Sequence, residues 1–277
     1  MRYFGSARPL RSAGAGDPRA SERLPTGRSN LKTVLITGAS RGIGRATALL
    51  CGARGWAVAV NYVRNEHAAE DTARAVRAAG GRAAILGCDV SVEADVIAMF
   101  DETQSRFGQI HGVVINAGIV APALKLADMT LDRLKRVFDV NVLGAYLCAR
   151  ESARRMPRER GGAGGSVVLV SSAATRLGSP AEYVDYAGSK AALDTLTIGL
   201  AKELGHSGVR VNAVRPGLVE TEIHASGGQP DRAQRLGATT PIGRAGRAEE
   251  IAEPIVWLLS DAASYVTGAI LDVAGGR

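Results

Sequence analysis

The sequence predicts an α/β protein built on a single parallel sheet with helices on both faces. Two observations support this: strand-like apolar runs alternate with helical patterns, and 277 residues suit one domain of this class. In such a sheet, ligands bind at the carboxyl ends of the strands. The expected strands are 33–37, 57–62, 82–86, 112–115, 166–171, 210–214 and 269–273, and the expected helices are 43–54, 66–79, 93–107, 130–157, 184–205 and 248–260.

The first expected strand enters a glycine-rich turn, from which an apolar-periodic helix leaves. Three glycines there would allow a tight turn, close approach of the backbone to a phosphate, and close packing of helix on strand. The helix N-terminus also presents free N–H groups and a partial positive charge to a pyrophosphate. This context favours a dinucleotide site over an ordinary strand-to-helix turn. The predicted binding loop comprises Gly38, Ser40, Arg41, Gly42, Ile43 and Gly44.

Tyr186 is followed four residues later by Lys190, within an expected helix. Residues at this spacing share one helix face, so the phenol and the ammonium can approach each other. A cation about 4 Å away favours the phenolate and could lower the tyrosine pKa by roughly 2–3 units from about 10. Such a tyrosine is a candidate general acid/base, although the same spacing also occurs in ordinary exposed pairs.

The order of these and further motifs resembles the short-chain dehydrogenase/reductase family from about Lys32 to Arg277. Within it, Asn61-Tyr62 and the ending Val266-Thr267-Gly268 are most similar to glucose-1-dehydrogenase-like and ketoacyl-reductase-like members. The resemblance implies a Rossmann-type doubly wound parallel sheet and an oxidoreductase that interconverts a carbonyl and an alcohol. The matching elements are Thr37 to Gly44, Asp89-Val90, Asn116-Ala117-Gly118, Asn141, Ser171-Ser172, Tyr186 with Lys190, and Pro216-Gly217 with Thr221.

By this resemblance, Tyr186 donates or removes the proton, Ser172 bonds the reacting oxygen, and Lys190 lowers the tyrosine pKa and bonds the cofactor ribose. Asn141 holds a water in a proton relay; from the residues alone, it could equally be a satisfied buried amide. Ser172 precedes Tyr186 by fourteen positions, one more than is usual in the family, so the loop between them must bulge. Ser171 is therefore an alternative to Ser172.

The end of the second expected strand bears on cofactor choice. An acid there usually selects NAD, yet here no acid occurs before Glu66, and Arg41 and Arg64 could face a 2′-phosphate. NADP(H) is therefore favoured, with NAD(H) as the alternative and solvent-exposed arginines as the ordinary interpretation. The remaining cofactor contacts implied by the resemblance are Asn61, Tyr62, Asp89, Val90, Asn116, Ala117, Gly118, Pro216, Gly217, Val219 and Thr221, beside Tyr186 and Lys190.

Residues 217–246 are rich in Gly, Thr and polar groups and are predicted to form a mobile substrate lid. The candidate lining is polar, which suggests a small polar carbonyl or alcohol such as a sugar. Its members are Glu182, Tyr183, Glu222, His224 and Ser226. A lone histidine such as His224 is more commonly an exposed residue.

Composition bounds the remaining possibilities. Residues 1–30 hold six arginines against two acids, contribute +4 of the +7 net charge, and are expected to be a disordered basic tail before a catalytic domain over 31–277. No run is long enough to span a bilayer, no cluster has metal-ligand spacing, and three cysteines in apolar contexts indicate a reducing, cytoplasmic setting. The family implies a homotetramer or dimer. The alternatives are an NADPH-binding regulator without turnover and, more remotely, a nucleic-acid-binding protein.

Overall fold

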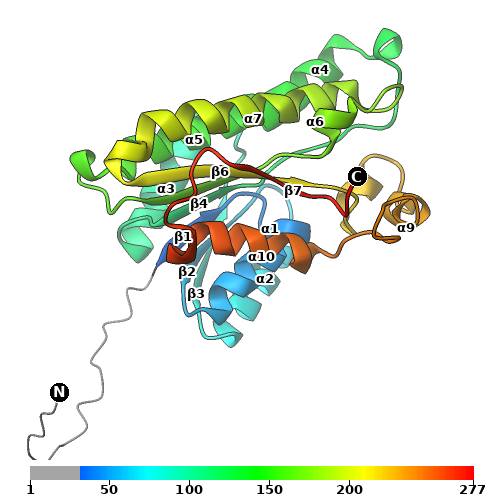
Figure 1. Cartoon of the computed structure of the whole chain (residues 1–277). Helices are drawn as coiled ribbons and strands as arrows, with labels where there is room; N and C mark the ends of the chain where they lie inside the picture. Colours follow the sequence, from blue (N-terminus) through cyan, green and yellow to red (C-terminus); the bar gives the residue numbers. More distant parts are fainter. Residues whose placement is uncertain (1–31) are drawn as a thin grey trace, which may run out of the picture. The chain divides into compact units, whose positions relative to one another are not determined.

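Seven parallel strands form the centre of the computed structural model, which describes residues 32–277 (Figure 1). The predicted basic tail, 1–30, lies outside the described residues. The strand order is β3-β2-β1-β4-β5-β6-β7. Their bounds are β1 Thr33–Ile36, β2 Ala57–Tyr62, β3 Arg82–Gly87, β4 Gly112–Ile115, β5 Gly165–Val170, β6 Val209–Pro216 and β7 Ile270–Val273. The order reverses between β1 and β4, which is where such sheets bind ligands.

Helices cover both faces of this sheet, as Figure 1 shows. One face carries α1 Gly42–Ala53, α2 Glu66–Ala78 and α10 Ala248–Leu259; the other carries α3 Glu93–Phe107, α5 Gly144–Arg155 and α7 Val184–Leu204. Alternation along β1 explains the two layers: Val34 and Ile36 pack with the first group, and Leu35 packs with the second. The predicted doubly wound α/β class is confirmed.

Two predicted segments differ in detail. The expected helix 130–157 is interrupted, because a π-helical segment, Asp139–Leu143, separates α4 Leu131–Phe138 from α5. The expected lid contains two short helices, α8 Ile223–Ser226 and α9 Arg232–Gly237. The short remaining elements are η1 Leu126–Asp128, η3 Arg158–Arg160, α6 Ala174–Leu177, η4 Gly205–Ser207 and η5 Asp261–Ala263. π-Helical turns often occur at functional sites, and this one carries Asn141.

The three cysteines, Cys51, Cys88 and Cys148, are buried and unpaired, as expected of small core residues. Burial raises the pKa of Cys51 to about 12, so its thiol stays protonated and unreactive at neutral pH. Within residues 32–277, no helix is long and apolar enough to cross a bilayer, and no group of His, Cys, Asp and Glu is arranged to hold a metal ion.

Candidate active site

A cavity of about 740 Å³ opens along the carboxyl ends of the central strands. The glycine turn after β1, the loops after β2 and β4, Ser171 to Ala174 after β5, and the segment after β6 contribute to its wall. Helix α7 contributes Tyr186 and Lys190. The cavity therefore gathers both predicted motifs, although they lie more than a hundred residues apart in the sequence.

The glycines of the turn meet three separate requirements. Gly38 and Gly42 have φ values of +65° and +53°, a left-handed conformation that favours glycine. Gly44 has an ordinary φ, but a Cβ there would lie 2.4 Å from the carbonyl oxygen of Gly38. The turn can thus bring the N-terminus of α1 close to a bound phosphate, and the first turn of that helix carries no acidic side chain that would repel one.

The side chains of Asn61 and Asn116 form hydrogen bonds with the backbone of this turn. The Asn61 side chain accepts from the backbone N–H of Gly38 at 3.0 Å and donates to the carbonyls of Leu86 and Cys88. Asn116 donates to the carbonyls of Thr37 and Gly38 at 2.9 and 3.1 Å. Asn61 is fully buried and does not line the cavity, so its contacts in the structure are with the backbone of the turn, and its direct contact with the cofactor stays a prediction.

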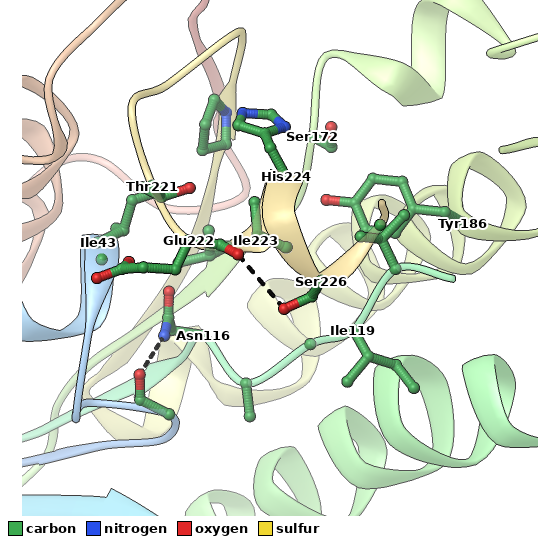
Figure 2. A pocket seen from close by; sticks show the side chains of 18 of the residues that line it. Ile43, Asn116, Ile119, Ser172, Tyr186, Thr221, Glu222, Ile223, His224 and Ser226 are labelled. Carbon is green, nitrogen blue, oxygen red and sulfur yellow. Dashed lines mark hydrogen bonds between the residues drawn. The ribbon is translucent and has the colours of Figure 1, made fainter. Parts of the chain in front are cut away.

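Tyr186 and Lys190 lie on one face of α7, with the ammonium 5.8 Å from the centroid of the phenol ring. Lys190 is buried, and its Nζ donates to the carbonyl oxygen of Val170 at 2.8 Å. Ser172 lies beside Tyr186 at the cavity wall, as Figure 2 shows. A substrate oxygen in this part of the cavity would be within reach of both hydroxyl groups.

The pKa values of this pair depend first on burial. Burial raises the pKa of Tyr186, and the hydroxyl of Ser172 opposes that rise. Burial also lowers the pKa of Lys190 to about 8, against the attraction of Asp194. The expectation that Lys190 lowers the pKa of Tyr186 is not met, because low-dielectric surroundings disfavour the charged form of both groups.

The two adjacent serines, which both line the cavity, differ in their hydrogen bonds. Ser171 is buried and donates to the carbonyl of Lys190 at 3.2 Å, whereas the Ser172 hydroxyl accepts from the backbone N–H of Ala174 at 3.1 Å and borders Tyr186. In the loop to α7, where a bulge is predicted, Ser179 and Ala181 have positive φ values of 45° and 59°. Such backbone is strained by about 1–3 kcal/mol per residue and commonly occurs at functional sites.

Asn141 is a fully satisfied buried amide. Its Oδ1 accepts from the N–H of Ile119 at 2.7 Å, and its Nδ2 donates to the carbonyl of Ile119 and the hydroxyl of Ser189 at 2.9 and 3.0 Å. The side chain does not line the cavity, so the water relay stays a prediction. A Cβ at Gly118 would lie 3.1 Å from the Lys190 ammonium and 3.3 Å from the Asn141 oxygen, so glycine at 118 keeps that space open.

The lid supplies the polar wall expected from the sequence. Thr221, Glu222, His224 and Ser226 all line the cavity, and Figure 2 shows them opposite the segment with Asn116 and Ile119. His224 is half-buried and bonds the carbonyl of Val219 at 2.9 Å; burial lowers its pKa, so it is neutral at pH 7.

One predicted substrate residue needs correction. Tyr183 lines the cavity, but Glu182 does not, because its carboxylate is paired with the guanidinium of Arg232.

Other lining residues were not predicted from the sequence. Arg136 has its guanidinium 3.8 Å from the carboxylate of Asp89 and helps to lower the pKa of that carboxyl, which also accepts from Ser91. Nothing in a single sequence marks an exposed helical arginine as different from its neighbours. The rest are Val63, Asn65, Ala68, Ile119, Val120, Val140, Val170, Ala173, Ala174, Leu177, Ser179, Leu218, Ile223, Gly227, Arg232 and Arg277.

Comparisons with known proteins decide the family. Residues 38–277 match the family profile described as enoyl-(acyl carrier protein) reductase. An uncharacterized oxidoreductase of Escherichia coli K12 is 52% identical over 243 residues, which cover 88% of this chain and 98% of that protein. The chain belongs to the short-chain dehydrogenase/reductase family. It is an oxidoreductase, and proteins of this family use a nicotinamide dinucleotide.

Two further short-chain dehydrogenase/reductase relatives cover nearly the whole described chain. L-rhamnose 1-dehydrogenase (NAD(P)(+)) of a Sphingomonas species is 41% identical over 250 residues, covering 88% of this chain and 95% of that protein. The crystal structure of levodione reductase superposes with a TM-score of 0.82 at 33% identity, covering 88% and 96% of the two chains. The glycine turn fits the dinucleotide of this family, since Gly38 and Gly42 border the cavity without side chains and the first turn of α1 carries no acidic residue.

Proposed function

We propose that this protein is an NADP(H)-preferring oxidoreductase that interconverts a small polar secondary alcohol and its ketone, with Tyr186 as general acid/base. The observation that carries the proposal is the joint placement of Ser172, Tyr186 and Lys190 on the cavity that also holds the glycine turn. The regulator alternative is less favoured, because the reacting set is complete.

Each side chain has a distinct part in the proposed reaction. In the reducing direction, the phenol of Tyr186 gives its proton to the carbonyl oxygen, and the hydroxyl of Ser172 donates a hydrogen bond to that same oxygen. In the oxidising direction, the phenolate, which the raised pKa makes available only at higher pH, removes the proton of the alcohol. Hydride exchange with the substrate carbon is the chemistry that a bound nicotinamide dinucleotide supplies. Because burial raises the pKa of Tyr186, the phenol is protonated at neutral pH, as reduction requires.

Residues along the cavity support NADP(H). Arg41 and Arg64 are exposed and line the cavity where the loops after β1 and β2 meet. Within residues 32–277, neither guanidinium makes a side-chain hydrogen bond or ion pair. Two free guanidinium groups suit a 2′-phosphate, whereas the first acid after β2 is Glu66, beside the hydroxyl of Tyr62.

The polar lid supports a small hydroxylated substrate. Glu222, His224 and Ser226 offer carboxylate, imidazole and hydroxyl groups to the cavity. The relative that acts on L-rhamnose, by its name, is consistent with a sugar or a similar hydroxylated ring.

We also propose that the protein assembles as a homotetramer or dimer. Helices α5 and α7 cover the same face of the sheet, and their apolar residues Tyr146 and Ile198 are each 43% exposed. A second copy of the chain could cover these side chains. A cytoplasmic location stays a prediction, supported by the three unpaired buried thiols.

The test is turnover with NADPH or NADP⁺ and a panel of sugars, cyclic alcohols and their ketones, followed by cofactor absorbance. Tyr186→Phe removes only the acidic hydroxyl, and we expect it to lower kcat by about 10²–10⁴-fold while NADPH still binds. Tyr265→Phe is the matched control, since it removes the same hydroxyl from a tyrosine that is fully exposed and does not line the cavity. Undiminished turnover in Tyr186→Phe would reject the role of this tyrosine.

A further inference from the structure

The lid is joined to the loop that leads into α7 by a compact polar cluster. The guanidinium of Arg232, the first residue of α9, binds both carboxylate oxygens of Glu182 at 2.8 and 2.6 Å. Its Nη1 also donates to the Gln229 side-chain oxygen at 3.1 Å, and the amide nitrogen of Gln229 donates to the hydroxyl of Tyr183 at 2.8 Å. The guanidinium lies 5.0 Å from the centroid of the Tyr183 ring. We call these four residues the lid clasp.

The clasp is built more tightly than an ordinary surface ion pair. The side chain of Arg232 is only 11% exposed, and a two-pronged contact between guanidinium and carboxylate adds geometric specificity to the attraction. Each partner stabilises the charge of the other: the Arg232 guanidinium lowers the pKa of Glu182, and the carboxylate raises the pKa of Arg232. The pair therefore stays ionised across the neutral range.

The position of the clasp connects it to the reacting residues. Tyr183 immediately precedes α7 and lies three residues before Tyr186, and both Tyr183 and Arg232 line the cavity. The carbonyl of Glu182 accepts from the N–H of Leu124, so the same loop is also tied to the segment after β4. A Cβ at Gly227 would lie 3.1 Å from Val120, which shows how closely the lid approaches that segment.

We propose that Arg232 and Glu182 are positioning residues that hold the lid closed over the substrate half of the cavity. This inference rests on the proposed function for its kinetic consequence. The glycine turn and the arginines after β1 and β2 take no part in the clasp, so its loss opens the substrate side while the cofactor site keeps its contacts. Closing contacts of this kind orient substrate and exclude water.

The experiment compares Arg232→Gln, Glu182→Gln and the double variant in the full chain. Hydrogen exchange over residues 223–240 reports lid opening without any substrate. We expect each single variant to speed exchange there by about tenfold, and the double variant to add little, because residues that act as one unit are non-additive. Arg232→Lys keeps the charge without the fork and should restore protection only in part.

Arg106→Gln is the matched control, because Arg106 forms a 2.6 Å pair with Glu102 on α3, with both side chains about half exposed. For the alcohol found in the turnover test, KM should rise by about tenfold in the clasp variants while the NADPH Kd changes by less than about twofold. Unchanged lid exchange, or fully additive effects of the two substitutions, would overturn the clasp. Faster lid exchange without any turnover by the native chain would instead reject the proposed function and leave the clasp standing.

Discussion

At the scale of single residues, two asparagines near strand ends hold the backbone of the glycine turn in place. The Asn61 side chain accepts from the N–H of Gly38 and donates to the carbonyls of Leu86 and Cys88. Asn116 holds the two carbonyls before the same turn. The conformation of the phosphate-binding turn is therefore set by side chains that the phosphate itself would not touch.

Cofactor selectivity is also decided by single residues. Arg64→Gln should raise the NADPH Kd by about tenfold or more, because a hydrogen bond to a charged group contributes roughly 1.5–3 kcal/mol, while the NADH Kd should change little. Fluorescence titration with both nucleotides measures the two values. Arg74→Gln is the control, because Arg74 lies on α2 outside the cavity and is 69% exposed. An equal loss for both nucleotides would argue against a 2′-phosphate contact.

At the scale of elements, a buried ion pair holds the N-terminus of α7 against α4. Arg133 on α4 binds the Asp185 carboxylate at 2.9 and 3.3 Å and also donates to the carbonyl of Pro122. Asp185 lies one residue before Tyr186, with a side chain only 1% exposed. This ion pair joins α4, the segment after β4 and the first turn of α7, so the position of Tyr186 depends on all three.

Breaking this pair should be costly. Arg133→Gln leaves the buried carboxylate of Asp185 without its cation and should lower the free energy of unfolding by about 3–5 kcal/mol, as removal of one partner of a buried pair does. Chemical denaturation measures the loss. Arg77→Gln, which removes a pair with Glu70 in which both side chains are over 40% exposed, should cost about 1 kcal/mol or less. Similar losses in the two variants would show that Arg133 is effectively solvated.

At the scale of the whole molecule, one face of the sheet carries helices with apolar side chains that remain exposed. Tyr146 and Ile198 are 43% exposed and Leu143 is 55% exposed. Exposed apolar side chains that gather on one surface commonly mark an interface, and a symmetric dimer would bury each of them against a second copy.

Ile198→Glu should therefore shift the protein toward smaller assemblies, because a carboxylate would be desolvated in an apolar interface. Light scattering after size-exclusion chromatography measures the molar mass. Trp257→Glu is the control, since Trp257 is 40% exposed and belongs to α10, which covers the opposite face of the sheet. A native chain that runs as a monomer would refute the assembly.

The succession of strands and helices along the chain, the glycine turn and the pairing of Tyr186 with Lys190 can be predicted from the sequence. These features depend on periodicity and on neighbours within a few residues, so they can be read locally. The interruption of the helix around Asn141 could not be predicted in this way, because the Asn141 amide bonds Ile119 and Ser189, which lie 22 and 48 residues away.

Other contacts of the site residues depend on packing between segments that are distant in the sequence. The Ser171 hydroxyl bonds the carbonyl of Lys190, the Asn61 amide bonds the N–H of Gly38, the Glu182 carboxylate binds Arg232 fifty residues away, and burial raises the pKa of Tyr186. The physical reason is common to all four. A polar side chain takes its role from the partners and the solvent that packing leaves it, and those partners come from distant parts of the chain.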